Sequence, residues 1–346
     1  MTPGTVSIHT TLTSSSGTIY TTLYRFRATS LTAALARDHL SRQRAFNPCR
    51  CKHSSSGSRQ LVSAVAVVDQ EPLQPAKKTR PTAQQIFDLQ HVPELSPSLV
   101  LYFPVGILFA SIRMALWVLL LAADVPWLTD NNTSIAVLQR ILGVHVNWHH
   151  LDRIPNKRHV LVSNHLTAGD LMMLYSLPRH YIHLISAKLP ERISQASHHR
   201  VRLWHATKDM YQDLSDSSAH TDPIHLFPEG VMTNGSGMVQ FSRGFMRFGR
   251  SLPIVPVALR VTVPWNIQTH TLTSSFAANL FWFCFVPWVR LDATVLKPMS
   301  LFEGQGNGAF VEGVQKTIAT ELGVGIADIT THEKKQLIRQ YSKRRH

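Results

Sequence analysis

The sequence has 346 residues, of which 44% are hydrophobic and only 16% are charged, so it can bury the core of one or two domains. Its formal net charge is +14, a balance that suits a nucleic acid, an anionic membrane or a phosphate-bearing substrate. No basic run alternates with aromatic residues and no nucleic-acid module signature occurs, so we expect no nucleic-acid partner.

The first 80 residues differ in composition from the rest of the chain. They are rich in Ser, Thr and Arg, and Asp38 is the one acidic residue before Asp69. Such a composition does not bury a core, so residues 1–80 are predicted to be a disordered tail or a targeting segment. Residues 81–97, which contain scattered prolines, are predicted to be a linker.

Residues 98–128 form the most apolar stretch. It exceeds the roughly 20 residues that a spanning helix needs, but Pro104-Val105-Gly106 interrupts its first half and Arg113 lies in its middle. Because a charge at the bilayer centre is costly, we expect a membrane hairpin or re-entrant segment that lets Arg113 reach water or headgroups. One tilted span and a buried core helix are the alternatives.

Beyond residue 133, apolar runs alternate with helix-like segments. Strands are predicted over 159–164, 181–187, 223–230 and 252–263, and helices over 134–143, 170–177 and 309–323. A second apolar patch, 276–289, is too short to span a membrane and suits an interfacial segment or a wall for an acyl chain. This alternation predicts an α/β domain over residues 133–325, with a mixed, mainly parallel sheet flanked by helices. Residues 326–346 are predicted to be a solvated basic tail.

The segment LVSNHLTAGDLMML, residues 161–174, places a base and a carboxylate between two apolar runs. His165 and Asp170 can meet if His165 lies in the turn after a strand and Asp170 lies in the first helical turn, with Thr167 as the N-cap. That arrangement predicts a general base held in one tautomer by a carboxylate. The alternative is a surface histidine beside an aspartate that only stabilises a helix N-terminus.

The tetrapeptide Phe227-Pro228-Glu229-Gly230 is the most specific signal, because such a run is expected far less than once by chance in a chain of this composition. It ends a predicted strand, which is where open α/β sheets place their sites. Arg243 follows a polar turn downstream, and an arginine beside free backbone amides is suited to binding a phosphate.

These motifs, together with the strand Val255–Ala258, stand in the order and spacing of the glycerolipid acyltransferase (PlsC-type) family, which the sequence resembles. The resemblance implies transfer of a fatty acyl group from acyl-CoA to a hydroxyl of a glycerol-phosphate or lysophospholipid acceptor, without a metal or organic cofactor. It implies that His165 takes the hydroxyl proton, that Asp170 orients His165, and that backbone amides at the helix start hold the oxyanion. The substrate-binding residues that it implies are Asn164, Phe227, Pro228, Glu229, Gly230 and Arg243.

The apolar stretch and the last third of the chain resemble one branch of this family, whose members are hairpin-anchored at the endoplasmic reticulum and lipid droplets. This implies that location, unless the N-terminal segment targets another organelle. It also implies an alternative function, a non-catalytic adaptor with protein partners from the quality-control machinery. Members of the branch carry a ubiquitin-binding CUE module after the acyltransferase domain, whereas we expect none in a sequence that stops at YSKRRH.

Two departures from the family pattern bear on activity. The second family motif is not recognisable, and the corresponding region offers Arg200, Arg202 and Lys208 without the usual order, which leaves the acceptor open. The branch often has Glu-Glu where this sequence has Glu229-Gly230, and the intact pair favours retained activity.

Overall fold

The structure is a computed structural model that describes residues 80–122, 130–186, 200–215 and 220–343. Residues 1–79 of the predicted tail lie outside these ranges. The helices are α2 (Ala83–Ile86), α3 (Pro97–Ala122), α5 (Asn132–Leu142), α6 (Met172–Tyr175), α8 (Lys208–Ser215), α9 (Met246–Gly249), α10 (Phe276–Phe285), α11 (Asn307–Leu322) and α12 (Thr331–Lys343), with short 3-10 turns at Leu151–Arg153 and Pro264–Asn266. The strands are β1 (Val144–His149), β2 (Val160–Ser163), β3 (Tyr181–Ile185), β4 (Val201–His205), β5 (Ile224–Leu226), β6 (Gly237–Met238), β7 (Ile254–Thr262), β8 (Val289–Val295) and β9 (Gly325–Ile326).

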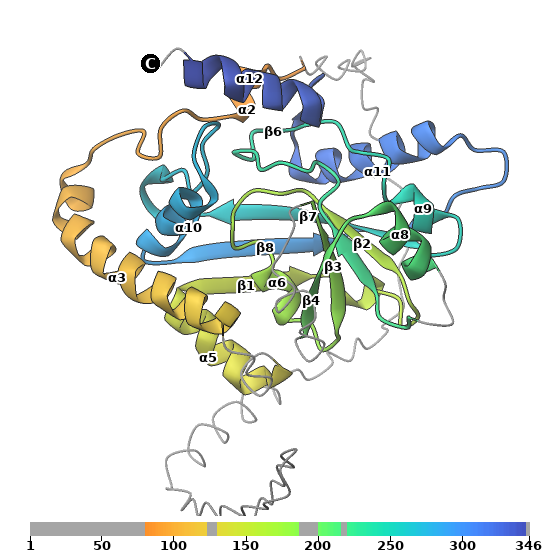
Figure 1. Cartoon of the computed structure of the whole chain (residues 1–346), viewed down its shortest axis with the longest axis horizontal. Coiled ribbons are helices and arrows are strands. Elements are labelled where there is room, and N and C mark those ends of the chain that lie inside the picture. The colour runs from red at the N-terminus through yellow and green to blue at the C-terminus, as the bar shows by residue number, and fades with distance from the viewer. Residues whose placement is uncertain (1–79, 123–129, 187–199, 216–219, 344–346) are drawn as a thin grey trace, which may run out of the picture. The chain divides into compact units, whose positions relative to one another are not determined.

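Seven of these strands form one sheet in the order β1-β8-β7-β2-β5-β3-β4 (Figure 1). The five strands from β7 to β4 run parallel, and β8 pairs antiparallel with β7 and parallel with β1. The predicted mixed, mainly parallel sheet flanked by helices is therefore confirmed. The four predicted strands correspond to β2, β3, β5 and β7.

Apolar side chains cover both faces of the sheet, as expected for parallel strands buried between helices. Along β2, Leu161 faces a cluster that includes residues of α3, α5, α6 and α10, whereas Val160 and Val162 face a cluster that includes residues of α8, α9 and α11. The period-2 alternation of a strand assigns successive residues to opposite layers. The helix predicted at 309–323 is α11, and it ends at Gly323, whose φ of 72° is the left-handed conformation that glycine adopts readily.

The helix α3 runs without interruption over 26 residues, with Pro104 inside it. The break expected at Pro104-Val105-Gly106 therefore does not occur. In the part of the chain that the structure describes, α3 is the one helix long and apolar enough to cross a membrane. Only 17% of its most apolar segment is buried inside the protein. Residues 123–128 of the predicted hairpin lie outside the described ranges.

The environment of Arg113 also differs from the expectation. Its side chain does not reach solvent, since only 6% of the residue is exposed. The guanidinium donates hydrogen bonds to the carbonyl oxygens of Ile141, Cys284, Val286 and Pro287. Helices α5 and α10 end at these carbonyls, and such ends favour a cation. Arg113 thus joins α3 to the domain instead of facing lipid headgroups.

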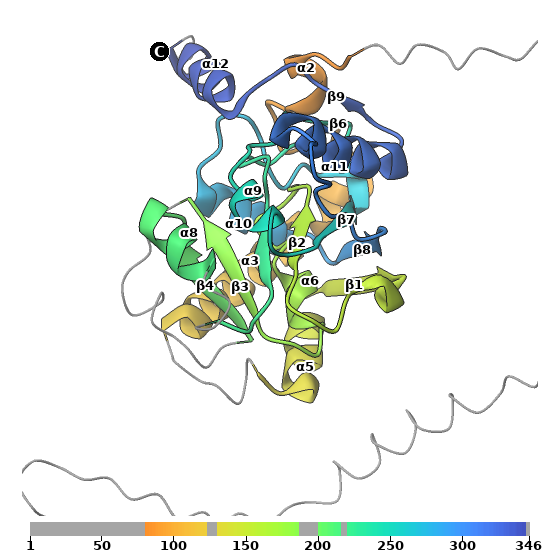
Figure 2. The same cartoon turned by 90° about the vertical axis from the view of Figure 1, so that its right-hand side faces the viewer.

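The C-terminal segment is not a solvated tail over its described residues. Helix α12 packs its apolar side chains Leu337, Ile338 and Tyr341 against a cluster that contains Phe87 and Val239. Figures 1 and 2 both show α12 at the same end of the domain as α2 and β6. The apolar positions of α12 recur at three- and four-residue spacing, but the partners that cover them are distant in sequence.

Candidate active site

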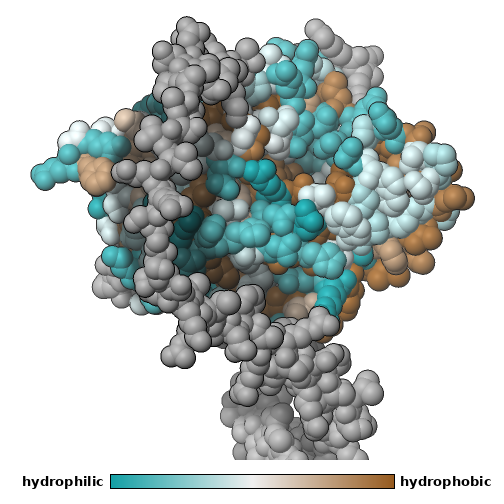
Figure 3. All heavy atoms as spheres, turned by 180° about the vertical axis from the view of Figure 1, so that it is seen from behind, coloured by the Kyte–Doolittle hydropathy of each residue, from teal (hydrophilic) through white to brown (hydrophobic). Residues whose placement is uncertain are grey.

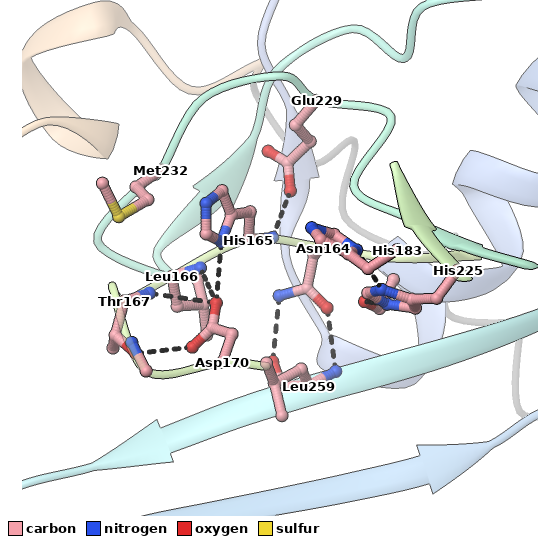
Figure 4. Close-up of polar contacts among 12 residues, drawn as sticks. Asn164, His165, Leu166, Thr167, Asp170, His183, His225, Glu229, Met232 and Leu259 are labelled. Atoms are coloured by element: carbon pink, nitrogen blue, oxygen red, sulfur yellow. Dashed lines mark hydrogen bonds and ion pairs between the residues drawn. The ribbon is translucent and has the colours of Figure 1, made fainter. Parts of the chain in front are cut away.

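The two sequence motifs meet because their strands are neighbours. Strands β2 and β5 pair in parallel with Val162 opposite Leu226, so the residues after each strand emerge at the same edge of the sheet. His165 and Asp170 follow β2, and Phe227 and Glu229 follow β5. Figure 4 shows His165, Asp170 and Glu229 gathered at the carboxyl end of the two strands, the usual place for a site in an open α/β sheet.

Asp170 and His165 form the pair that the sequence predicts. Asp170 is fully buried, and its Oδ2 lies 2.9 Å from Nδ1 of His165. The carboxylate also accepts the backbone N–H groups of Leu166 and Thr167 and the hydroxyl of Thr167. Because an ionised carboxylate only accepts hydrogen bonds, Nδ1 of His165 carries the proton and Nε2 has a free lone pair. The His165 side chain remains 22% exposed, so Nε2 is the atom available to take a proton.

The local backbone around Asp170 differs from the predicted one. Helix α6 begins at Met172, so Asp170 lies in a turn before the helix and Thr167 is not its N-cap. The Thr167 hydroxyl instead accepts the N–H of Gly169 while it donates to Asp170. The resemblance implied that backbone amides at the helix start hold the oxyanion. The amides of Leu166 and Thr167 both donate to the Asp170 carboxylate, so these two are not free for that role.

Glu229 of the Phe227–Gly230 motif supports the backbone of the loop that carries His165. Its two oxygens accept the N–H of His165 and the N–H of Val239, each at 3.1 Å. The loop also holds His165 from its other side, since Thr233 donates its N–H to the His165 carbonyl. Burial raises the pKa of Glu229 to about 8, and these two amides and Lys334 oppose that rise. Glu229 therefore positions His165 and does not face the solvent.

The other residues of the motif shape the same loop. The ring of Phe227 stacks on the imidazole of His165, with 4.0 Å between ring centres and 7° between planes. Pro228 accepts the N–H of Ser242. Gly230 closes the turn by donating to the carbonyl of Phe227, and its φ of 63° is left-handed, a conformation in which a side chain is strained.

Two buried histidines, which sequence reasoning missed, lie behind Phe227. His183 of β3 and His225 of β5 face each other across the parallel pair with 2.8 Å between their Nδ1 atoms, and Nε2 of His225 lies 3.0 Å from the Ser163 hydroxyl. Burial lowers the pKa of His183 to about 3 and also lowers that of His225. Both are therefore neutral near pH 7. A histidine within each of two apolar strands was the available signal, but only the sheet register pairs them.

The remaining predicted substrate-binding residues, Asn164 and Arg243, differ in position and surroundings. Both polar atoms of the Asn164 side chain are bonded to the backbone of Leu259, so Asn164 ties the end of β2 to β7 (Figure 4). Arg243 is exposed and lines a cavity of about 710 Å³ together with residues of α11. A Cβ added at Gly308, in the first turn of α11, would lie 3.5 Å from its guanidinium. The structure therefore does not bring Arg243 into the contacts of His165 and Glu229.

Two of the three cations that stand in place of the second family motif, Arg200 and Arg202, are held by the protein itself. Arg200 is buried and donates to the side chain of Asn132 and to three backbone carbonyls, those of Asp130, Tyr175 and Leu177. Arg202 forms an ion pair with Asp222. These bonds give both arginines a structural role in joining β4 to neighbouring segments.

A cavity of about 390 Å³ lies against the loop that carries His165 and Asp170. Its walls include Leu166 and Thr167 of that loop, Thr233 of the loop that follows Gly230, and Leu259 and His270. The site thus combines a buried, hydrogen-bonded carboxylate, an imidazole with a free Nε2 and an adjacent cavity. This constellation can remove a proton from a hydroxyl that approaches Nε2.

Comparison with known proteins finds similarity to acyltransferases and to AUP1 proteins. Residues 145–260 match the family model described as Acyltransferase. The chain is 29% identical over 271 residues to the lipid droplet-regulating VLDL assembly factor AUP1 of Danio rerio, a match that covers 74% of this chain and 62% of that protein. It is 22% identical over 223 residues to glycerol-3-phosphate acyltransferase 3 of the same species, covering 57% and 46%. A match to the crystal structure of the 1-acyl-sn-glycerophosphate acyltransferase PlsC from Thermotoga maritima covers 65% of this chain and 96% of the PlsC chain. Its sequence identity is 11% and its TM-score is 0.44.

Residues 145–260 thus match an acyltransferase domain, and both motifs of the site fall within these residues. Within that class, the AUP1 proteins of zebrafish and human are similar to it over 74% of its length. The chain spans 62–65% of the length of these two relatives.

Proposed function

We propose that this protein transfers a fatty acyl group from acyl-CoA to a hydroxyl of a glycerol-phosphate or lysophospholipid acceptor at a membrane or lipid-droplet surface. The observation that carries the proposal is the His165–Asp170 pair, whose hydrogen bonds leave Nε2 of His165 unprotonated and partly exposed. In this reaction Nε2 takes the proton of the acceptor hydroxyl while the oxygen attacks the thioester carbonyl. The C–S bond then breaks, and the thiolate leaves with the proton from His165. The reaction as proposed uses no cofactor.

The surface of α3 supports a membrane location. Large apolar residues on α3 are exposed, and we define Val100, Leu101, Val105, Leu108, Ile112, Val118 and Leu119 as the outer face of α3. Seen from behind, hydrophobic residues gather along the edge where Figure 1 places α3 (Figure 3). A contiguous apolar surface of this kind marks a membrane or protein interface. The names of the AUP1 relatives, which refer to lipid droplets, point the same way.

The proposed reaction is tested by acyl transfer with His165→Ala. The full chain in detergent or reconstituted vesicles is incubated with labelled acyl-CoA and with lysophosphatidic acid, other lysophospholipids or glycerol-3-phosphate. Removing a general base typically costs about 10²- to 10⁴-fold in rate, so we expect the variant to lose at least that much. His145→Ala, which alters an exposed histidine of β1, is the matched control and should keep wild-type turnover.

Two results of this assay would contradict the proposal. Equal product from wild type and His165→Ala would show that the pair does not act as a base. No turnover by the wild type with any acceptor of the panel would instead favour an adaptor that keeps the acyltransferase fold without its chemistry, with protein partners of the quality-control machinery.

Membrane association is tested by changing the outer face of α3. Leu101 and Leu108 are 80% and 58% exposed and lie seven residues apart, on one side of the helix. Because an aspartate in an apolar membrane environment costs about 2.5–3.5 kcal/mol, the double variant Leu101→Asp/Leu108→Asp should reduce flotation with phosphatidylcholine vesicles by about tenfold or more. Phe302→Asp, which changes an equally exposed apolar residue between β8 and α11, should float like wild type. Equal flotation of all three proteins would exclude α3 as the membrane contact.

A further inference from the structure

Helix α12 brings a buried cation to the loop that supports the catalytic histidine. Lys334 is 4% exposed, although lysine is almost never buried without a partner. Its position lies far beyond residues 145–260, which match the acyltransferase family model. The apolar contacts of α12 already hold the helix on the domain, so packing alone does not account for a lysine on its inner side.

The contacts of Lys334 connect it to the loop that follows the Phe227–Gly230 motif. Its Nζ donates a hydrogen bond of 3.0 Å to the carbonyl of Met232, two residues after Gly230, and lies 4.6 Å from the centre of the Phe87 ring. Figure 4 shows Met232 on the loop that joins Glu229 to the surroundings of His165. Lys334 and Glu229 are also electrostatic partners, each of which favours the charged form of the other.

This partnership matters because Glu229 is a fully buried carboxylate. Burial raises the pKa of Glu229 and lowers that of Lys334, and each charge opposes the shift of the other group, so loss of Lys334 would raise the pKa of Glu229 further. Only the ionised carboxylate presents two full acceptors to the N–H groups of His165 and Val239. Asp170 also faces Glu229 and opposes its ionisation, and His270 faces Lys334.

We propose that Lys334 is a positioning residue of the active site, whose ammonium group favours the ionised form of Glu229 that accepts the backbone N–H of His165. Its catalytic consequence rests on the acyltransferase reaction proposed above. The docking of α12 is then part of the assembly of the site: a helix outside the matched family region determines how firmly the base is held. Lys334 acts through Glu229 and does not itself contact the reacting atoms.

The positional part of the proposal is tested without any turnover. Hydrogen exchange is measured on the amides of His165 and Val239 in the full chain, for wild type, Lys334→Met, Lys334→Arg and Arg339→Met. Methionine keeps the apolar length of the side chain but removes the charge. We expect Lys334→Met to speed exchange at both amides by about tenfold or more, Lys334→Arg to restore protection, and Arg339→Met, on the exposed side of the same helix, to match wild type. Unchanged protection in a folded Lys334→Met variant would overturn the proposal.

The catalytic part is tested by the dependence of turnover on pH. Without Lys334 the carboxyl of Glu229 ionises at higher pH. In Lys334→Met, the part of the pH profile in which kcat rises with pH should therefore shift to higher pH by about one unit or more. The acceptor KM should remain within twofold, and Lys334→Arg should return this part of the profile to its wild-type position. A fall in activity that is uniform across pH would overturn the positioning role. If the wild type shows no turnover, the acyltransferase proposal fails, and the exchange experiment still decides the role of Lys334.

Discussion

Replacing Asp170 with asparagine is expected to lower turnover by about 10³- to 10⁴-fold, the order of loss seen when an orienting carboxylate of a catalytic histidine becomes an amide. Asp170 accepts hydrogen bonds from four donors, namely His165 Nδ1, two backbone amides and the Thr167 hydroxyl. An asparagine offers one acceptor oxygen and places an NH₂ group among the remaining donors. The imidazole is then free to take the other tautomer, in which Nε2 carries the proton and no longer acts as a base.

The same substitution should destabilise the fold. A buried donor that loses its acceptor costs about 1–3 kcal/mol, and at least two of the four donors around Asp170 lose theirs. We therefore expect Asp170→Asn to lower the free energy of unfolding by about 2–5 kcal/mol, measured by denaturant or thermal unfolding in parallel with kcat. Asp152→Asn, at an exposed aspartate, is the control for both readouts. If Asp170→Asn keeps turnover within tenfold of wild type, Asp170 does not orient the base.

Replacing Arg113 with methionine is expected to lower the free energy of unfolding by about 3–5 kcal/mol, because hydrogen bonds to a charged group contribute about 1.5–3 kcal/mol each and buried carbonyls lose their donor. The guanidinium donates to Ile141 at 3.0 Å, to Cys284 at 3.1 Å, to Val286 at 2.6 Å and to Pro287 at 3.0 Å. Among the described residues, no other side chain donates a hydrogen bond to these four carbonyls. Methionine fills the apolar volume of the stem but leaves these groups without a donor.

This loss should appear as a fall in Tm of about 10 °C, since 1 kcal/mol corresponds to about 2–4 °C in a domain of this size. Arg140→Met removes an exposed arginine of α5 and should leave Tm within about 2 °C of wild type. Limited proteolysis gives a second readout, because α3 is joined to α5 and α10 through Arg113 and should become cleavable. A variant that unfolds like wild type would show that Arg113 is solvated in the protein and does not hold α3.

The local features of this protein were predictable from short stretches of sequence. Strand β2, the contact between His165 and Asp170, and the end of α11 at Gly323 depend on residues within a few positions of one another. Alternation, turn chemistry and a left-handed glycine act over that distance. The likeness of the motifs to an acyltransferase domain was equally available, because each motif is a contiguous run.

The tertiary structure decided which distant groups meet. His183 and His225 pair only because β3 and β5 are in register, and Arg113 meets carbonyls up to 174 positions away. In the sequence, Arg113 was predicted to reach lipid headgroups and Lys334 lay in a predicted solvated tail, since a charged residue in either context is expected to seek water. The fold instead offers Arg113 a set of buried carbonyls and Lys334 a buried carboxylate, and a buried partner of this kind offsets the loss of solvation. The sequence by itself thus determined four strands of the sheet, the pairing of His165 with Asp170 and the resemblance to an acyltransferase domain. The partners of the buried charges depended on how distant segments pack, which local patterns do not encode.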